Sequence, residues 1–360
     1  MASTADLWAK RVLRWLSQAF VILLIVLTLD YVLLATVFSD MKRGWADGAT
    51  AYTHAYIPSP LLHHTLAPNQ NSNRPWGNIN YRFQTDRHGF RTGPCAATDD
   101  DKDRPAIFAV GDSFTEALGV PYEESFVGLM ACDARKQGKA VWNLGVTSYS
   151  PLIYQRKIRA AAEELGIKPS EIYVFLDVSD IDDEANVYRV DEHGDIKMTL
   201  AYHWFDTGQF LLGNFATFRL AYDLWLKSPF ATAGSYGRER ASWTFDRQLL
   251  EAWGKRGLAL AAKNLGVIVD MCREWQCQIT LVVYPWPDNV AAGDPNGIQV
   301  TYWRNWAAAQ GVRFVDGFAP FFHDPADVTV DKNYIRGDTH FNANGHRLLF
   351  EQLRRSAGEF

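Results

Sequence analysis

Residues 106–115 read AIFAVGDSFT, and this stretch decides the fold class. Its first half, Ala106–Val110, is an unbroken apolar run, as expected for a strand buried on both faces of a sheet. A Gly-Asp-Ser tripeptide ending at Ser113 follows at once, and apolar residues then recur at helical spacing over residues 126–130. The stretch therefore predicts a buried strand that ends in a polar loop and leads into a helix.

The same alternation continues toward the C-terminus. Four further short apolar runs are predicted strands: Ala140–Leu144, Glu171–Leu176, Ile279–Tyr284 and Arg313–Val315. Helices are predicted over residues 150–166, 246–275, 298–310 and from about 343 onward, and the first of them begins with an N-cap serine followed by proline. Strands alternating with helices indicate a parallel sheet covered on both faces. We predict an α/β fold, a flavodoxin-like three-layer sandwich with a five-stranded parallel sheet.

The N-terminal segment predicts a transmembrane helix. Residues 15–38 read WLSQAFVILLIVLTLDYVLLATVF, twenty-four residues with a single charge, Asp30. This length crosses a bilayer, whereas the apolar region of a cleavable signal peptide is shorter, about 7–15 residues. Cleavage near Ala35 is the alternative. Because a carboxylate in lipid is costly, we expect Asp30 to reach the outer interface rather than to pair with another membrane protein.

The patterns divide the chain into four segments. Residues 1–14 are a predicted cytoplasmic leader, 15–38 the transmembrane helix, and 39–103 a loop-rich extracytoplasmic neck. Residues 104–360 form the predicted catalytic domain, with an aromatic-rich insertion at about 185–245. Basic residues flank the span on both sides, so the orientation rests on the ease with which the large C-terminal part can translocate. We expect a single-pass protein of the inner (cytoplasmic) membrane with a periplasmic domain.

Composition excludes other classes of protein. The 360 residues carry a formal net charge of −5 with a pI near 6.0 and contain no Lys/Arg-rich block, so nucleic acid is not an expected partner. The cysteines lack the paired spacing of a zinc site, and a chain of this size does not need a disulfide framework. We therefore expect no metal, no cofactor and four ordinary thiols: Cys95, Cys132, Cys272 and Cys277.

Chemistry-bearing residues follow the predicted strands, where ligands of such sheets bind. Ser113 follows the first strand, and Asp338 and His340 stand two apart ahead of the last helix. A serine hydroxyl needs a base to take its proton, and a histidine base needs a carboxylate to orient it. In an extended segment residues i and i+2 project to the same side, so Asp338 and His340 can supply both. Backbone N–H groups near Ser113, and that of Gly145, could bind an oxyanion.

An acidic run follows the third predicted strand: Asp177, Asp180, Asp182, Asp183 and Glu184. Such a cluster could bind a divalent cation, but we prefer the interpretation that it caps the following helix, where negative charge is favourable. We expect His346 to be structural. The remaining histidines considered are expected to be surface or loop residues: His63, His64, His193, His203 and His323.

Together these motifs resemble the SGNH (GDSL) hydrolase family over roughly residues 75–360. The resemblance is closest to its membrane-anchored, extracytoplasmic branch, similar to polysaccharide and alginate O-acetylation proteins. It is carried by four motifs: GFR at 89–91, GDSFTEALGV at 111–120, YPWP at 284–287 and GDTHFNANGH at 337–346. The resemblance implies Ser113 as nucleophile, His340 as base and Asp338 as its orienter. The implied oxyanion donors are Ser113, Gly145 and, where the family has asparagine, Ser179.

The resemblance implies an enzyme that moves or removes an acyl group, above all acetyl, on a cell-envelope or exported carbohydrate. Release of an acyl-serine by water makes an esterase, and release by a sugar hydroxyl makes an O-acyltransferase. Two alternatives stay open: a non-catalytic assembly or recruitment partner of a membrane-bound O-acyltransferase, which the departure at Ser179 favours, and a polysaccharide-binding module. Expected partners are thus a carbohydrate or acyl-ester substrate, the membrane and an acyltransferase.

Overall fold

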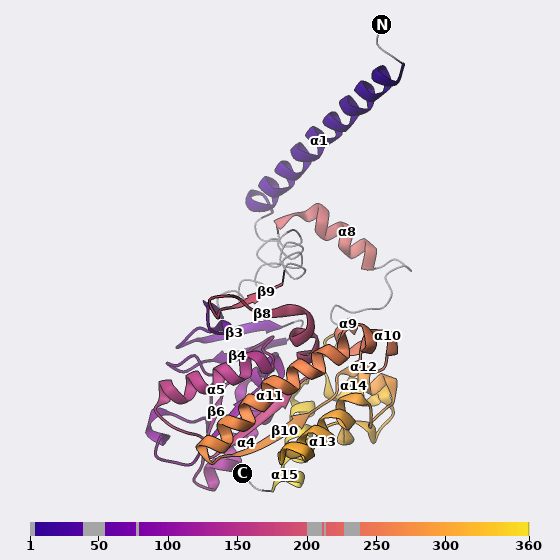
Figure 1. Ribbon diagram of the computed structural model, residues 1–360. Coiled ribbons are helices and arrows are strands. Elements are labelled where there is room, and N and C mark those ends of the chain that lie inside the picture. Colours follow the sequence, from indigo (N-terminus) through magenta and orange to yellow (C-terminus); the bar gives the residue numbers. More distant parts are fainter. Residues whose placement is uncertain are drawn as a thin grey trace. The chain divides into compact units, whose positions relative to one another are not determined.

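A five-stranded parallel sheet is the centre of the computed structural model (Figure 1). Its strands are β5 (Ala106–Val110), β6 (Ala140–Asn143), β7 (Glu171–Leu176), β10 (Gln278–Val283) and β11 (Arg313–Asp316). They lie in the order β11-β10-β7-β5-β6, which is the 2-1-3-4-5 order of flavodoxin-like sheets. All five residues of β5 are buried, as their unbroken apolar run predicts. The predicted fold class is confirmed.

The structure describes residues 4–38, 55–76, 79–199, 211, 214–226, 238–358 and 360. The chain divides into two units. One unit comprises Met1–Ala51 and Leu200–Ala233, and the other, which contains the sheet, comprises Tyr52–Thr199 and Gly234–Phe360.

Two helical layers cover the sheet. Helices α5 (Pro151–Leu165), α11 (Lys255–Trp275) and α13 (Ile298–Gln310) pack together over one face. Helices α4 (Phe126–Lys136) and α15 (Ala343–Ala357) pack against each other over the opposite face. This division follows from right-handed crossovers in a sheet of this strand order.

Shorter helices join these elements. The α-helices are α3 (Ser113–Glu116), α6 (Asp180–Asp182), α9 (Arg238–Ser242), α10 (Arg247–Leu249), α12 (Pro287–Ala292) and α14 (Ala326–Asn333). The 3₁₀ turns are η1 (Asp99–Asp101), η2 (Tyr122–Glu124) and η5 (Ala319–Phe322), and the π turns are η3 (Asp183–Val187) and η4 (Leu250–Gly254).

Residues 56–84, which we expected to be rich in loops, form two antiparallel hairpins. The first pairs β1 (Tyr56–Ser59) with β2 (His63–Leu66), and the second pairs β3 (Asn71–Trp76) with β4 (Ile79–Gln84). The neck prediction treated proline and asparagine as loop formers, yet short two-stranded ribbons also tolerate them.

The GFR motif attaches these hairpins to the sheet. Gly89 has a φ of 74°, and a Cβ added there would lie 2.4 Å from the carbonyl oxygen of Leu66, so only glycine fits. Arg91 is 1% exposed, and its guanidinium donates to the carbonyl oxygens of Glu116 at 3.0 Å and Val120 at 3.2 Å. The motif thus braces the segment that follows β5.

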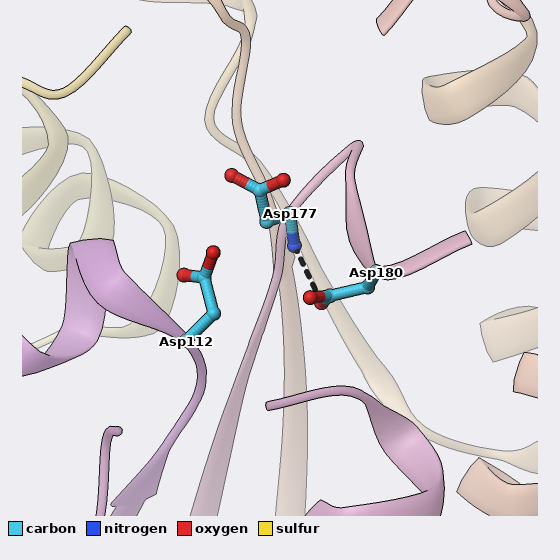
Figure 2. Close-up of side chains that lie close together, drawn as sticks. All are labelled: Asp112, Asp177 and Asp180. Carbon is cyan, nitrogen blue, oxygen red and sulfur yellow. Dashed lines mark hydrogen bonds between the residues drawn. The ribbon is translucent and has the colours of Figure 1, made fainter. Parts of the chain in front are cut away.

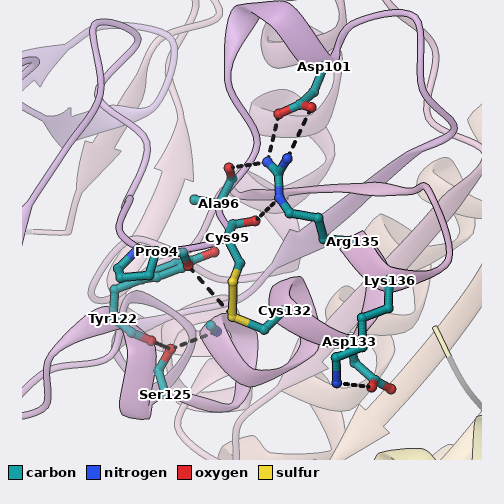
Figure 3. Close-up of a disulfide and its surroundings, with 11 residues drawn as sticks. Pro94, Cys95, Ala96, Asp101, Tyr122, Ser125, Cys132, Asp133, Arg135 and Lys136 are labelled. Carbon is teal, nitrogen blue, oxygen red and sulfur yellow. Dashed lines mark hydrogen bonds and ion pairs between the residues drawn. A yellow bond between two sulfur atoms is a disulfide. The ribbon is translucent and has the colours of Figure 1, made fainter.

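The four cysteines form two disulfides, so the expectation of ordinary thiols is wrong. Cys95 pairs with Cys132 of α4, and Cys272 of α11 pairs with Cys277, both with a Cα–Cα distance of 4.9 Å. Around the first disulfide, Arg135 donates to the carbonyl oxygens of Cys95 and Ala96 (Figure 3). Chain length was a poor guide, because disulfides depend on the compartment of a protein as well as on its size.

The region of the expected aromatic insertion, about 185–245, is described in part. It contains the hairpin β8 (Tyr188–Val190) and β9 (Ile196–Met198), helix α8 (Ala216–Leu226) and α9. Five aromatic residues on which the prediction rested lie outside the described residues: Tyr202, His203, Trp204, Phe205 and Phe210.

Helix α1 (Thr4–Thr36) is long and apolar enough to cross a membrane. The candidate span, Lys10–Thr36, has a mean hydropathy of 2.5. It overlaps the predicted segment 15–38 over residues 15–36, begins five residues earlier and ends two residues earlier.

Candidate active site

Ser113 is the first residue of α3, directly after the carboxyl end of β5. The side chain of Asp112 caps this four-residue helix by accepting the Phe114 N–H at 3.1 Å, and the chain leaves it through Ala117, whose φ is 69°. The Ser113 N–H has no acceptor among the described residues, as expected at the first turn of a helix. This geometry presents both the hydroxyl and the N–H of Ser113 at the end of the sheet.

Three residues that are distant in the sequence form a continuous hydrogen-bonded chain. Ser113 Oγ lies 2.8 Å from His340 Nε2, and His340 Nδ1 lies 2.5 Å from Asp338 Oδ1. The backbone N–H of His340 also donates to Asp338 Oδ1 at 2.9 Å, which fixes the two residues relative to each other. The structure therefore brings together the three residues that the sequence analysis proposed as nucleophile, base and orienter.

The pKa shifts of Asp338 and His340 suit a histidine that acts as a general base. Burial opposes the charge of Asp338, but the neighbouring His340 and its hydrogen bonds outweigh burial and lower the pKa of Asp338 to about 2. Burial likewise opposes the charge of His340, but the Asp338 carboxylate outweighs it and raises the pKa of His340 above the usual value. An ionised Asp338 thus stabilises the imidazolium that forms when His340 accepts the serine proton.

Trp76 is a site residue that the sequence analysis missed. Its indole Nε1–H donates to Asp338 Oδ2 at 2.9 Å, and its ring packs edge-on against the His340 imidazole with a centroid distance of 5.3 Å. Trp76 lies at the end of β3, 262 residues before Asp338. A tryptophan in a neck segment carries no local signal of such a role.

We expect Trp76→Phe to lower kcat about tenfold with little change in KM. The phenyl ring keeps the packing against His340 but removes the donor to Asp338, and a hydrogen bond to a charged group contributes about 1.5–3 kcal/mol. Steady-state kinetics on an acetyl ester measure the effect. Trp306→Phe in α13, whose ring contacts Trp303 rather than a residue of the site, is the matched control and should retain full activity. Equal losses in both variants would contradict a positioning role for Trp76.

The loop between β6 and α5 holds the expected oxyanion donor Gly145, but its N–H is engaged. It donates to Asn143 Oδ1 at 2.9 Å, and the neighbouring N–H groups of residues 144, 146, 147 and 149 also donate to described acceptors. Ser148 is the exception, since its N–H has no acceptor among the described residues. Ser148 also has a φ of 58°, an uncommon conformation for a residue other than glycine that tends to occur at functional sites.

A buried carboxylate holds this loop against α3. Glu116 Oε2 accepts the Thr147 N–H at 2.7 Å and the Thr147 hydroxyl at 2.8 Å, while the Tyr56 hydroxyl donates to Glu116 Oε1 at 2.8 Å. The Asn143 amide donates to the carbonyl oxygen of Thr115 at 2.8 Å. These bonds fix the loop next to the helix on which Ser113 lies.

Ser179 is buried directly after β7 and interacts with Asp177. Both its N–H and its hydroxyl donate to the Asp177 carboxylate, and Asp177 also accepts the Trp286 indole N–H at 2.5 Å. Ser179 is the N-cap residue of α6 but makes no side-chain capping bond there. Its hydroxyl therefore does not cap this helix, and an oxyanion role would require the hydroxyl to leave Asp177.

We expect Ser179→Ala to lower the free energy of unfolding by about 1 kcal/mol, because it removes one hydrogen bond to a buried carboxylate. Because that bond occupies the hydroxyl, kcat should change less than about threefold. Thermal unfolding and kinetics measured on the same sample separate the effects. A fall in kcat of tenfold or more, at unchanged KM and stability, would instead assign Ser179 to the oxyanion, and Ser179→Asn should then preserve activity.

Three buried carboxylates lie together beside Ser113. Asp112, Asp177 and Asp180 each place an oxygen within 4.8 Å of the others (Figure 2). Five of the six oxygens accept hydrogen bonds, from Phe114, Ser113, Tyr284, Ser179, Trp286, Tyr154 and the Asp177 N–H, and Asp180 Oδ1 accepts none from any described residue. A divalent cation with an oxygen-rich shell would have to displace most of these donors. The donor set fits shared protons better than a cation.

The carboxyl groups of this cluster have raised pKa values. Burial raises the pKa of Asp112 and of Asp180 well above the usual range, with mutual repulsion adding to it, and burial also raises the pKa of Asp177. The Ser113 hydroxyl has two neighbours, His340 Nε2 at 2.8 Å and Asp112 Oδ2 at 3.2 Å. His340 Nε2 is the nearer of the two, and its position favours it as the acceptor of the serine proton.

The acidic run does not cap the helix that follows it, contrary to our expectation. Glu184 accepts the Leu152 N–H at 2.5 Å and so caps the first turn of α5 instead. Asp182 and Asp183 pair with Arg240 of α9, at 3.0 Å and 2.6 Å. The acidic residues are therefore internal partners of distant elements, which no local pattern could indicate.

Two of the histidines expected at the surface or in loops lie in β2. His64 Nε2 is 2.8 Å from the carbonyl oxygen of Thr147, and burial lowers the pKa of His64 to about 4. His63 Nδ1 is 2.9 Å from His64 Nδ1. His346 is 1% exposed in α15 and accepts the Phe126 N–H at 3.3 Å, consistent with a structural role.

No protein-family model matches the chain, and no curated protein matches it. Solved structures with a similar fold include the psychrotrophic esterase EstA from Pseudoalteromonas sp., with 13% identity and a TM-score of 0.40 over 70% of this chain and 96% of that chain. An acetylxylan esterase from Geobacillus stearothermophilus has 15% identity and a TM-score of 0.39 over 71% and 95%. The structure of TesA has 14% identity and a TM-score of 0.40 over 70% and 97%.

Proposed function

We propose that this protein is a serine-dependent acyl-ester hydrolase or O-acyltransferase with Ser113 as nucleophile, His340 as base and Asp338 as its orienter. The observation that carries the proposal is the hydrogen-bonded chain from Ser113 Oγ through both ring nitrogens of His340 to Asp338, with distances of 2.8 Å and 2.5 Å. Such a chain is the arrangement that activates a serine hydroxyl for attack on a carbonyl.

The first half-reaction forms an acyl-serine. Ser113 Oγ attacks the carbonyl carbon of the ester while its proton moves to His340 Nε2, and the carbonyl oxygen becomes an oxyanion. The tetrahedral intermediate collapses, the bond to the alcohol oxygen breaks, and the leaving alcohol takes the proton from His340. A water molecule or a sugar hydroxyl then repeats these steps in reverse, and Ser113 recovers its proton.

The oxyanion needs donors that are not committed elsewhere. Among the residues that the structure describes, the N–H of Ser113 meets this condition, and in the loop after β6 so does the N–H of Ser148. The roles expected for Gly145 and Ser179 would require each to release the acceptor that it holds here. We therefore assign the oxyanion to Ser113 and Ser148.

We further propose that the substrate is an acetylated carbohydrate of the cell envelope and that the domain lies outside the cytoplasm, anchored by α1. Two features support this location: the apolar candidate span Lys10–Thr36 and two disulfides, which form in oxidising compartments. A reporter enzyme fused after Phe360 should therefore be active only in a form that works outside the cytoplasm.

A serine-reactive phosphonate tests the enzymatic proposal. The full-length chain in detergent should be labelled once, and mass spectrometry should place the label on the peptide that contains Ser113. Adding an acetyl ester with and without an oligosaccharide acceptor separates the two reactions, because only a transferase gives an acetylated sugar. A chain that is neither labelled nor able to hydrolyse or transfer acetyl groups would be a binding or recruitment protein instead.

A further inference from the structure

Asp30 in α1 accepts hydrogen bonds from a second helix of the same unit. Its Oδ1 accepts the Ala216 N–H at 3.0 Å, and its Oδ2 accepts the Thr217 N–H at 2.8 Å and the Thr217 hydroxyl at 2.6 Å. Ala216 and Thr217 are the first two residues of α8. We expected Asp30 to reach the interface alone, and the structure instead uses it to cap a second helix.

The contact is chemically specific. The first N–H groups of a helix have no partner within the helix, and a carboxylate there satisfies them and is favoured by the helix dipole. Aromatic packing adds to it, since Phe215 lies 5.8 Å from both Tyr31 and Phe218, measured between ring centroids. The start of α8 is thus fixed to α1 at residues 30 and 31.

The position of Asp30 places this junction at the edge of a bilayer. The span Lys10–Thr36 is 27 residues, about 40 Å as a helix, which matches a bilayer including its headgroup regions. Asp30 precedes Thr36 by six residues, about 9 Å along the helix axis. Since each headgroup region takes up about 5–7 Å, the carboxylate lies just inside the hydrocarbon boundary.

Helix α8 carries an apolar stripe that no described residue covers. Leu220 is 60% exposed and Leu224 is 59% exposed; they stand four residues apart, and Ala221 stands three residues before Leu224, so the three lie on one helix face. Phe218 beside this face is 37% exposed. In water such a stripe would be unfavourable, whereas an interfacial helix buries its apolar face about 5–10 Å into the headgroup and acyl boundary.

We propose that α8 is an interfacial helix whose Leu220 and Leu224 contact lipid acyl chains beside α1, with Asp30 fixing its N-terminus at that depth. The inference rests on the proposed anchoring by α1. The partner is the bilayer surface itself. Asp30 then ties the membrane-embedded helix and the surface helix into one membrane-binding element.

Site-specific fluorescence in liposomes tests the proposal. All four native cysteines are in disulfides, so a single introduced thiol can be labelled with an environment-sensitive dye. The full-length protein carries the dye at Leu224→Cys, in phosphatidylcholine and phosphatidylglycerol vesicles containing lipids with a quencher on the upper acyl chain. Val328→Cys in α14, 47% exposed, is the matched control for an exposed apolar position, and Leu24→Cys in α1 reports the anchor.

We expect lipid quenching at positions 224 and 24 but not at 328, and at least a threefold loss of quenching at 224 when Asp30→Leu removes the cap. Quenching at 24 without quenching at 224 would overturn the inference and leave the anchor intact. A blue-shifted dye at 224 without lipid quenching would show that protein covers the stripe, and would also overturn it. Absence of quenching at 24 together with extraction of the protein by alkaline carbonate would refute the anchor instead.

Discussion

Ser113→Ala should abolish hydrolysis of an acetyl ester, with kcat falling by about 10⁴–10⁶-fold. Removal of the nucleophile leaves only binding and the oxyanion donors, and single losses within such a triad have effects of this order. The variant should also resist phosphonate labelling. Its fold should be retained, because within the described part of the chain the hydroxyl bonds only to His340 and Asp112, at 2.8 Å and 3.2 Å, and two such bonds contribute about 1–3 kcal/mol.

A matched serine is available at the opposite end of the sheet. Ser170 precedes β7, and its hydroxyl donates to the carbonyl oxygen of Ala106 at 3.0 Å, so Ser170→Ala loses a comparable bond far from the site. We expect Ser170→Ala to keep its activity. If Ser113→Ala hydrolyses the ester at close to the wild-type rate while remaining folded, another residue is the nucleophile.

Asp338→Asn should lower kcat by about 10³–10⁴-fold, because an amide holds His340 in place but neither fixes the correct tautomer nor stabilises the imidazolium. The pH dependence gives a second readout. His340 must be neutral to act as base, and Asp338 raises its pKa, so the acid limb of kcat/KM should lie above pH 6.5 in the wild type. In the variant this limb should move to lower pH. An unchanged limb would show that His340 is not the titrating base.

The same pair makes stability depend on pH in a defined window. The folded-state pKa of Asp338 is lowered to about 2. Its contribution to the free energy of unfolding is therefore present above about pH 4 and is lost as the pH falls toward 2. The folded-state pKa of His340 is raised, so its contribution is present below pH 6.5 and is lost as the pH rises through the folded value. The wild type should therefore exceed Asp338→Asn in unfolding free energy most clearly between about pH 4 and 6.5, by about 2 kcal/mol.

The parts of this molecule that could be predicted are those with a local signal. The unbroken apolar run of β5 and the alternation of strands with helices that predicts α13 (Ile298–Gln310) place these elements at the predicted residues. Because parallel strands align their carboxyl ends, the loops after them had to meet, and Ser113 could be joined to a distant Asp-x-His segment on chemical grounds.

The remaining features depend on pairings that no local pattern encodes. Trp76 reaches Asp338 only because the β3–β4 hairpin lies against the C-terminal segment. Glu184 caps α5 rather than its own helix, and the Gly145 N–H is taken by Asn143, both through tertiary contacts. The cysteine prediction failed for a different reason, since it weighed chain length without weighing the compartment that the apolar helix implied.

The capping carboxylate at Asp30 also decides how this protein can be purified. In the sequence, the sheet-containing unit is interrupted after Thr199 and resumes at Gly234, and the inserted residues include α8. A chain trimmed before Tyr52 therefore still carries α8. Without Asp30 and Tyr31, the first turn of α8 loses its cap, which lowers the stability of the helix by about 1 kcal/mol. The exposed leucines then form an apolar surface that promotes aggregation in water. A monodisperse preparation without detergent thus needs two changes to the chain: removal of α1, and replacement of residues 200–233 by a short polar linker.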